Sequence, residues 1–492
     1  MPGISFRARR KPQGVCTSMP PRRRQVLVSN RLVDPAQPAA GGLAAALGGL
    51  MKAVPGLWLG SSGRINDAPH AGPLPLQRHG QTTLVPVDLS QAEHDLYYIG
   101  FANKVLWPVF HGLGQHAESD PQAMARFFEG YEQVNKRFAA TLAPLLQEDD
   151  VVWVHDYHLI PMAAELRRLG CSQRMGFFNH IPFPTPGELV QIPQHEQLVR
   201  SLFDYDLVGT QIRRDVERLH EYVEVRAQGR QPDAGHMQAF GRTVRTQHFP
   251  IGIDVAGFAS QHMGADAGPV LARVRRERRK RVVIAAADRM DYTKGVPERL
   301  AAFRLLLERH PECRRHVTLA QIASPSRESV AEYAAARDEV RDMVAALNKD
   351  YGSHGWTPVL HFEQVVDRRA MPEFFRLGRV GAVTPVADGM NLVAKEYVAA
   401  QDPELPGTLV LSQAAGAAEQ LTQALMVDPR DPAGMADTFH RALLMPLEER
   451  RERHAALLEN VQEEDLRWWS DSFLDALEGR GLPPLPVDPL AA

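Results

Sequence analysis

The chain has 492 residues and a formal net charge of −3, so it is too long for one ordinary core and suits two domains. A hydrophobic fraction of 44% with 23% charged residues is typical of a globular protein, and this charge gives no overall attraction to nucleic acid. The cysteines Cys16, Cys171 and Cys313 form no closely spaced pair, which argues against a disulfide framework or a zinc site and favours a reducing cytoplasm.

The first 24 residues are basic and contain no acidic residue. They lack the apolar core of a secretory signal, so we expect a disordered tail over residues 1–24, with Met19 as an alternative start of translation. The apolar stretch that follows, GGLAAALGGLMKAVPGLWLG, is interrupted by Lys52, Pro55 and several glycines. It therefore predicts a glycine turn that leads into a buried helix, and not a membrane span.

Apolar strands then alternate with amphipathic helices along the chain, as a doubly wound α/β protein requires. The predicted strands are VLVS (26–29), VVWV (151–154), MGFF (175–178), DLVG (206–209), VVIAAA (282–287), VTLAQIA (317–323), GAVTP (381–385) and TLVLS (408–412). With a crossover near residues 250–256, we expect a first domain over 25–252 and a second over 253–465. The segment 466–492 predicts a final amphipathic helix and a tail.

Two strands of the second domain lead into charged residues. The strand VVIAAA is followed by Arg289 and Lys294, and the strand GAVTP is followed by Asp388, with Glu396 eight residues further on in a helix. Open α/β sheets bind ligands at the carboxyl ends of their strands, where helix amino termini can also meet an anion. Cations suit a diphosphate and carboxylates suit ribose and sugar hydroxyls, so the pattern predicts a nucleotide-sugar site.

Each of these residues also has a plain structural interpretation. Arg289 and Lys294 could simply pair with Asp291 or Glu298 on the surface. The basic run RVRRERRKR (273–281) is better explained as a solvated helix face than as a nucleic-acid site, because aromatic residues do not interrupt it. The sequence shows neither a P-loop nor a dinucleotide-binding glycine motif.

Long motifs occur in the order VSNRL, GGLAAAL, WPVFH, VWVHDYHLIP, FFNHIPFPTP, FPIGID, DRMDYTKG, TLAQIASPSR and DGMNLVAKEYVAAQ. With them the chain resembles the retaining trehalose-6-phosphate synthases (UDP-forming) over roughly residues 26–469. The resemblance implies a GT-B fold, with two Rossmann-like domains, the active site in the cleft between them and a last helix that crosses back to the first domain. It also implies transfer of glucose from UDP-glucose to glucose-6-phosphate with retention, giving α,α-trehalose 6-phosphate and UDP.

The resemblance assigns an acceptor site to the first domain. Arg31, Tyr98 and Arg327 would surround the phosphate of glucose-6-phosphate, Asp156 would bind sugar hydroxyls and Trp107 would shape the pocket. The chemistry is consistent, because a dianionic phosphate prefers forked cations and a phenol, whereas hydroxyls prefer an ionised acceptor.

The resemblance assigns the donor site mainly to the second domain. The backbone of Gly42 would approach the donor phosphates, His180 would lie beside the donor sugar, and Val366 would contact the uracil through its backbone. The implied donor set is completed by Arg289, Lys294, Asp388, Leu392, Val393, Ala394, Lys395 and Glu396, and the implied catalytic set is Arg289, Lys294, His180 and Asp388. In a front-face mechanism the diphosphate leaving group, stabilised by Arg289 and Lys294, takes the acceptor proton.

We expect no cofactor and no metal, since UDP-glucose is a substrate and the family keeps the Asp204-Tyr205-Asp206 triplet without a required ion. His155 and His158 flank Asp156 but have no third zinc ligand at usable spacing. The expected assembly is a homodimer or homotetramer without nucleic acid or membrane, and a separate phosphatase would release trehalose.

One motif departs from the family. The segment LWLGSSG places Ser61 where relatives commonly have tryptophan, in what we expect to be a loop on the acceptor side. A different phosphorylated acceptor, such as glycerol-3-phosphate, therefore stays open. A non-catalytic sugar-phosphate sensor is a second alternative, against which the complete donor set argues. The sequence does not distinguish UDP from ADP or GDP donors.

Overall fold

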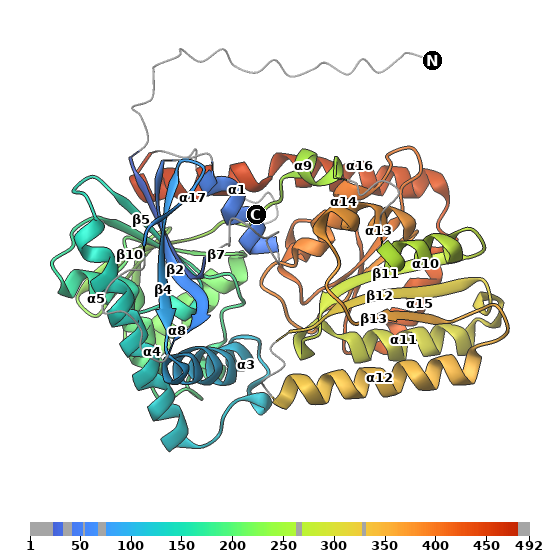
Figure 1. Cartoon of the computed structure of the whole chain (residues 1–492), viewed down its shortest axis with the longest axis horizontal. Coiled ribbons are helices and arrows are strands. Elements are labelled where there is room, and N and C mark those ends of the chain that lie inside the picture. Colours follow the sequence, from blue (N-terminus) through green and yellow to red (C-terminus); the bar gives the residue numbers. More distant parts are fainter. Residues whose placement is uncertain are drawn as a thin grey trace, which may run out of the picture.

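The computed structural model describes residues 23–32, 42–52, 55–66, 75–261, 268–326 and 331–480. These form two halves, each built on one sheet covered by helices, that lie side by side (Figure 1). The predicted basic tail lies outside the described residues except for Arg23 and Arg24. Arg24 is held in place by an ion pair with Asp150 at 2.6 Å.

The first sheet has ten strands and is mostly parallel. In the order in which they pair, its strands are β3 (Gln77–His79), β4 (Thr82–Leu89), β2 (Gly56–Ile65), β1 (Gln25–Arg31), β5 (Val151–His155), β6 (Arg174–Phe178), β7 (Leu207–Thr210), β10 (Arg242–His248), β9 (His236–Ala239) and β8 (Arg230–Asp233). Only β3, β9 and β8, at its two edges, pair in the antiparallel sense. The central strand β5 is buried along its whole length, as expected of a parallel strand covered on both faces.

The second sheet has six strands, and all its pairs are parallel. Their order is β13 (Val359–Phe362), β12 (Val317–Ser324), β11 (Val282–Arg289), β14 (Val380–Val383), β15 (Thr408–Ser412) and β16 (Leu425–Val427). The eight strands predicted from the sequence are all present. The doubly wound α/β fold is therefore confirmed.

Helices cover both sheets (Figure 1). In the first half they are α1 (Gly42–Lys52), α2 (Gln91–Glu93), the π-helix η1 (His94–Leu106), α3 (Trp107–Phe110), α4 (Pro121–Leu142), α5 (Met162–Arg168), α6 (Pro186–Leu189), α7 (His195–Leu202) and α8 (Arg213–Ala227). In the second half they are α9 (Val255–Ala259), α10 (Gly268–Arg278), α11 (Val296–Arg309), α12 (Ala331–Tyr351), α13 (Met371–Leu377), α14 (Leu392–Ala400), α15 (Pro432–Leu444) and α16 (Leu447–Glu463), followed by α17 (Leu466–Glu478). Among the described helices, none is both long and apolar enough to span a membrane.

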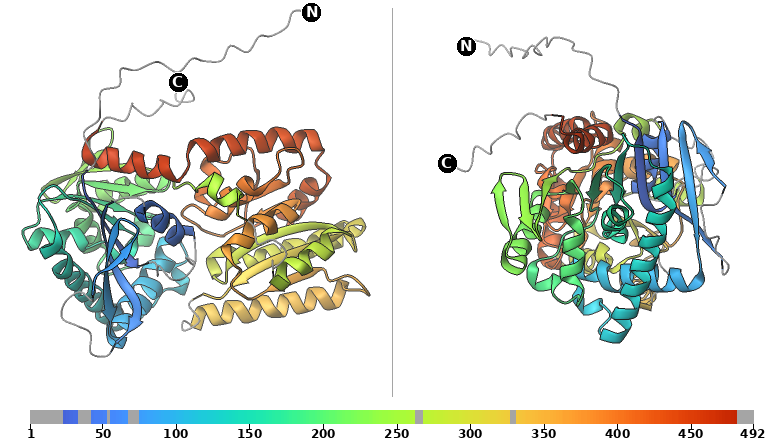
Figure 2. Two further views of the ribbon diagram at one scale, coloured as in Figure 1. Left: turned by 45° about the horizontal axis from the view of Figure 1, so that its top comes forward. Right: turned by 90° about the vertical axis from the view of Figure 1, so that its left-hand side faces the viewer.

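The chain passes from the first sheet to the second through residues 249–254, and the last helix returns. The backbone N–H of Leu466, which opens α17, donates to the carbonyl of Ile253 at 3.2 Å. α17 then packs on the first half, where Phe473 stacks on Trp153 with ring centroids 4.6 Å apart. Figure 2 shows α16 along the second half and α17 along the first. The crossover and the last helix therefore both join the two halves.

The loop expected around Ser61 is wrong. The strand β2 runs through this segment, and Ser61 lies in register with Arg31 of β1. Ser61 is buried and its hydroxyl accepts the N–H of Gly63 at 3.1 Å. A small hydroxyl side chain can satisfy this local bond within a strand, which explains why the segment continues the sheet.

Candidate active site

The carboxyl edge of the second sheet holds the predicted charged residues. Lys294 ends the short turn η6 (Tyr292–Lys294), and its Nζ lies 2.5 Å from Oδ2 of Asp388. The side-chain amide of Asn391 donates to the same oxygen at 3.0 Å. Asp291 caps η6, accepting the N–H of Thr293 at 3.0 Å. The surface-pair interpretation is therefore wrong for Lys294, and two separate motifs meet in one ion pair.

A buried arginine supports this edge from behind. Arg299 of α11 is fully buried, and its guanidinium lies 2.8 Å from a carboxylate oxygen of Asp288 in β11. It also donates to the side chains of Gln321 in β12 and Thr384 after β14, and to the carbonyl of Lys294 at 3.3 Å. One side chain thus links three neighbouring strands and the turn that carries Lys294.

The turn after Lys294 depends on glycine. Gly295 has a φ of +65°, in the left-handed region, and a Cβ at this position would lie 2.1 Å from the carbonyl oxygen of Thr384. A side chain would therefore clash with backbone that cannot move away. This requirement fixes where α11 begins and so where Lys294 lies.

The helix α14 presents its amino terminus to the same edge. Asn391, just before it, has a left-handed φ of 74°, and the first N–H groups of the helix belong to Leu392 and Val393, whereas the N–H of Ala394 donates to the carbonyl of Asn391 at 3.3 Å. Leu392 and Val393 are partly buried against the core, as is Val366 in the segment after β13. The helix start could therefore offer backbone N–H groups to an anion, as the sequence predicted for the donor loop.

Lys395 and Glu396 lie further along α14 and are both buried. The Nζ of Lys395 donates to the carbonyl of Ile251 in the crossover at 2.7 Å, and burial lowers the pKa of Lys395 to about 7. Only the backbone of Lys395 is therefore available to a donor in this arrangement. Glu396 pairs with Arg368 at 3.1 Å, and burial raises its pKa although Arg368 opposes the shift.

At the facing edge of the first sheet, His180 lies in a hydrogen-bonded chain whose direction can be derived. The backbone N–H of Ile251 donates to the side-chain oxygen of Gln211 at 3.0 Å, so the amide nitrogen of Gln211 faces His180. Nδ1 of His180 must then accept, and Nε2 must donate to Nδ1 of His155 at 3.0 Å. Burial lowers the pKa of His180 to about 3, which keeps the ring neutral.

Both ring nitrogens of His180 already have protein partners. A donor sugar beside this residue would therefore meet the backbone or the ring edge, unless one of these bonds is exchanged. His155 faces His180, whereas the ring of His158 stacks on Tyr98 with centroids 5.9 Å apart. Of the two histidines that flank Asp156 in the sequence, His155 therefore contacts His180 and His158 contacts Tyr98.

Three of the predicted acceptor residues, Arg31, Tyr98 and Asp156, lie at the same edge. Asp156 follows β5 with φ 79° and ψ 160°, a conformation that costs a non-glycine residue on the order of 1–3 kcal/mol. Its Oδ1 accepts the N–H of His180 at 3.2 Å. Arg31 ends β1, with its guanidinium close to Gly63, and Tyr98 lies half-buried on η1. Strain of this kind is concentrated at functional sites, which supports a role for Asp156.

The two edges are in direct contact. The guanidinium of Arg289, the last residue of β11, lies over the ring of Trp107 at 5.8 Å from its centroid. A Cβ on Gly389 would lie 2.1 Å from the carbonyl oxygen of His180, so the loop after β14 packs against the first half through bare backbone. The structure thus brings together Arg289 and Trp107, which were predicted to contact different substrates.

The remaining predicted residues lie as follows. Gly42 opens α1, and Arg327 lies outside the described residues. In the Asp204-Tyr205-Asp206 triplet, the two carboxylates pair with Arg242 and with Arg167, the latter at 3.0 Å. These pairs account for both carboxylates through structural contacts.

Sequence reasoning missed four residues of these edges: Gln211, Arg299, Arg368 and Asn391. Gln211 comes directly after β7, the same signal that identified Asp156 after β5. Arg299 lies on the helix face of Phe303 and Leu306, both buried, and a cation on an apolar face indicates a buried ion pair. Asn391 could have been suspected from the sequence DGMN, since Asn tolerates a left-handed turn.

Two Rossmann-like sheets whose polar carboxyl edges face each other define a glycosyltransferase of the GT-B fold. The sequence matches glycosyltransferase family 20 over residues 12–479. The chain belongs to this family.

Relatives and solved structures agree with this assignment. The trehalose-6-phosphate synthase of Enterobacter sp. (strain 638) is 42% identical over 457 residues, which cover 92% of this chain and 95% of that protein. An α,α-trehalose-phosphate synthase (UDP-forming) from Burkholderia xenovorans, solved in complex with glucose-6-phosphate, superposes with a TM-score of 0.88 at 40% identity and covers 93% of this chain and 100% of its own. A protein from E. coli bound with UDP-2-fluoro glucose gives 0.87 at 41% identity, with 94% and 100% covered.

Proposed function

We propose that this protein is a retaining glucosyltransferase that transfers glucose from UDP-glucose to the anomeric hydroxyl of glucose-6-phosphate. The products are α,α-trehalose 6-phosphate and UDP. The observation that carries the proposal is the contact between the two edges, where Arg289 lies over Trp107. The second edge also holds Lys294, paired with Asp388. The family membership and the substrates named for the relatives support it.

The chemistry follows from the charges at the second edge. The bond between the glucose C1 and the diphosphate oxygen breaks, and the bond from C1 to the acceptor oxygen forms on the same face. Arg289 and Lys294 stabilise the departing diphosphate, which takes the proton of the acceptor hydroxyl. Asp388 orients the glucose hydroxyls, and His180 and the closed packing of the two halves exclude water that would hydrolyse the donor.

Binding roles complete the proposal. The donor contacts backbone at Gly42, Val366 and the start of α14, with its ribose on Glu396. The acceptor phosphate binds Arg31, Tyr98 and Arg327, and its sugar hydroxyls bind Asp156 beside Trp107.

The cellular setting is also part of the proposal. Cys171 and Cys313 are free thiols, which supports a cytoplasmic enzyme. We further propose a homodimer or homotetramer, two domains over 25–252 and 253–465, and a separate phosphatase that consumes the product.

The deciding experiment measures nucleotide release by the purified full-length chain. UDP-glucose is supplied with glucose-6-phosphate, with glycerol-3-phosphate, or alone, and ADP- and GDP-glucose are tested in parallel. Release of UDP only with glucose-6-phosphate supports the proposal. Release with glycerol-3-phosphate instead would point to Ser61 beside Arg31, and silence with every donor would point to a sensor.

A further inference from the structure

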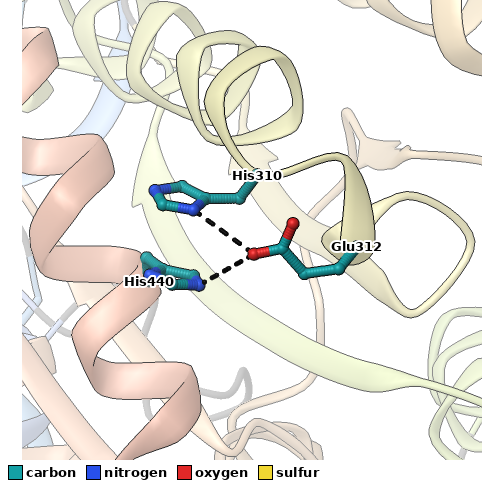
Figure 3. Close-up of side chains that lie close together, drawn as sticks. All are labelled: His310, Glu312 and His440. Carbon is teal, nitrogen blue, oxygen red and sulfur yellow. Dashed lines mark ion pairs between the residues drawn. The ribbon is translucent and has the colours of Figure 1, made fainter.

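Three side chains that can bind a metal ion meet at the far end of α11 from Lys294 (Figure 3). His310 directly follows α11, Glu312 lies in the turn Pro311–Cys313, and His440 lies on α15. Nδ1 of His310 is 3.4 Å, and Nε2 of His440 is 3.3 Å, from the same carboxylate oxygen of Glu312. One ligand atom from each residue lies within 4.8 Å of the others.

These separations are longer than good hydrogen bonds. A good N–H···O bond measures about 2.7–3.2 Å, shorter than either distance. In a tetrahedral site with metal–ligand bonds of about 2.0–2.1 Å, neighbouring ligand atoms lie about 3.3–3.4 Å apart. The two nitrogen–oxygen distances therefore match two edges of such a tetrahedron.

The cluster has to rearrange to take an ion. The rings of His310 and His440 are stacked with centroids 3.5 Å apart and planes at 11°. Because the lone pair of an imidazole nitrogen lies in the plane of its ring, the stack must open for both rings to bind one ion. Metal binding needs neutral imidazoles and an ionised carboxylate. The nearby Arg309 is paired with Asp437 at 3.2 Å, so its charge is compensated.

An ion could reach this cluster from solvent. The side chain of Glu312 is 65% exposed, and those of His310 and His440 are 24% and 22% exposed. Three protein ligands leave a fourth tetrahedral position for water.

We propose that His310, Glu312 and His440 bind a divalent transition-metal ion of the zinc class. Two imidazoles and one carboxylate suit Zn²⁺ or Ni²⁺, whereas Mg²⁺ prefers oxygen ligands alone. The 14 residues of α11 separate the site from Lys294 by about 21 Å, so the ion takes no part in glucose transfer. It joins the end of α11 to α15, two helices that already pack together, and stabilises the second half.

The test is calorimetric titration of Zn²⁺ into the EDTA-treated, dialysed full-length chain, with Ni²⁺ and Mg²⁺ in parallel. The variants His440→Gln and Glu312→Gln are compared with His354→Gln, which changes an exposed histidine outside the cluster. We expect one zinc site per chain in the wild type and in His354→Gln, and affinity lower by roughly tenfold or more in the other two variants. Zinc should raise the melting temperature only where the site is intact.

Equal zinc affinity and stoichiometry in all four proteins would overturn the proposal, as would a wild type that does not bind zinc. Melting temperatures measured in EDTA show whether each variant folds. Glu312→Gln changes a largely exposed side chain, so it keeps the test valid if His440→Gln is unstable. Turnover in EDTA should be equal in all four proteins, because the site lies away from Lys294.

Discussion

At the carboxyl edge of the second sheet the polar groups are ion pairs, whereas at the facing edge of the first sheet the central polar groups are neutral rings and an amide. At the edge of the second sheet the ion pairs are Lys294 with Asp388 and Arg299 with Asp288. At the edge of the first sheet, His180 is hydrogen-bonded between His155 and Gln211. In the reaction we propose, the donor diphosphate brings its own charge, so Lys294 would exchange part of its interaction with Asp388 for the ligand. The hydrogen-bonded series of Gln211, His180 and His155 needs no such exchange, and it fixes the orientation of the His180 ring instead.

The largest expected effect comes from breaking the buried pair behind the charged edge. Arg299→Met should lower the free energy of unfolding by about 3–5 kcal/mol, because Asp288 stays buried without its partner. Urea unfolding measures this, with the exposed Arg279→Met as control. The double variant with Asp288→Asn should recover much of the loss. A loss below about 1 kcal/mol in the single variant would show that this edge does not depend on ion pairing.

Removing a charge that we propose stabilises the leaving group should lower turnover. Arg289→Ala should lower turnover by roughly two to three orders of magnitude, as for loss of one preorganised charge donor. UDP release with both substrates measures the effect, and Arg279→Ala serves as the exposed control on the same half. Near-normal turnover would refute the role of Arg289, and a change in melting temperature alone would assign it to packing on Trp107.

Much of this comparison could be predicted from the sequence, because parallel strands carry simple signals. Apolar runs followed by a charged residue placed Arg289, Asp388 and Asp156 at strand ends. The structure confirms Arg289 and Asp156 there, whereas β14 already ends at Val383 and Asp388 lies beyond it, in an isolated bridge with Ala415. The pairing of Lys294 with Asp388 was not predictable, because 94 residues separate them and only the strand order brings β11 beside β14. The local sequence patterns of individual strands do not reveal the order of the strands in the sheet.

The features that the sequence did not predict all depend on contacts between segments that are distant in the sequence. The strand through Ser61 follows from pairing with β1, which overrides the glycine-rich local sequence. His310, Glu312 and His440 show no metal-binding spacing, because two lie in a turn and the third comes from another helix. Contacts that only tertiary packing creates cannot be predicted from local sequence patterns.

Substitutions of Gln211 test the carboxyl edge of the first sheet, and we expect a smaller effect from them. Gln211→Leu removes the donor to His180 and the acceptor for Ile251, and leaving such buried groups unpaired should cost about 1–3 kcal/mol of stability. Gln211→Glu keeps an acceptor for Ile251 but loses the amide donor, so Nδ1 of His180 should become the protonated nitrogen. Nitrogen NMR of labelled histidine reports the tautomer. An unchanged tautomer in Gln211→Glu would show that Gln211 does not orient His180.

A graded, pH-dependent effect concerns Lys395, the residue that links the second edge to the crossover. Burial lowers the pKa of Lys395 to about 7 in the folded protein, below its ordinary value of 10.5, so the unfolded chain binds more protons between these two pH values. Stability from this residue therefore rises with pH across that window, by up to about 1.4 kcal/mol per pH unit, and is constant below it. Lys395→Met removes the titrating group while keeping an apolar stem beside Ile251. The difference in unfolding free energy between wild type and variant should slope upward from pH 7 to 9 in urea titrations. Because every other group titrates in both proteins, a flat difference would mean that Lys395 stays charged when buried, with the carbonyl of Ile251 compensating its lost hydration.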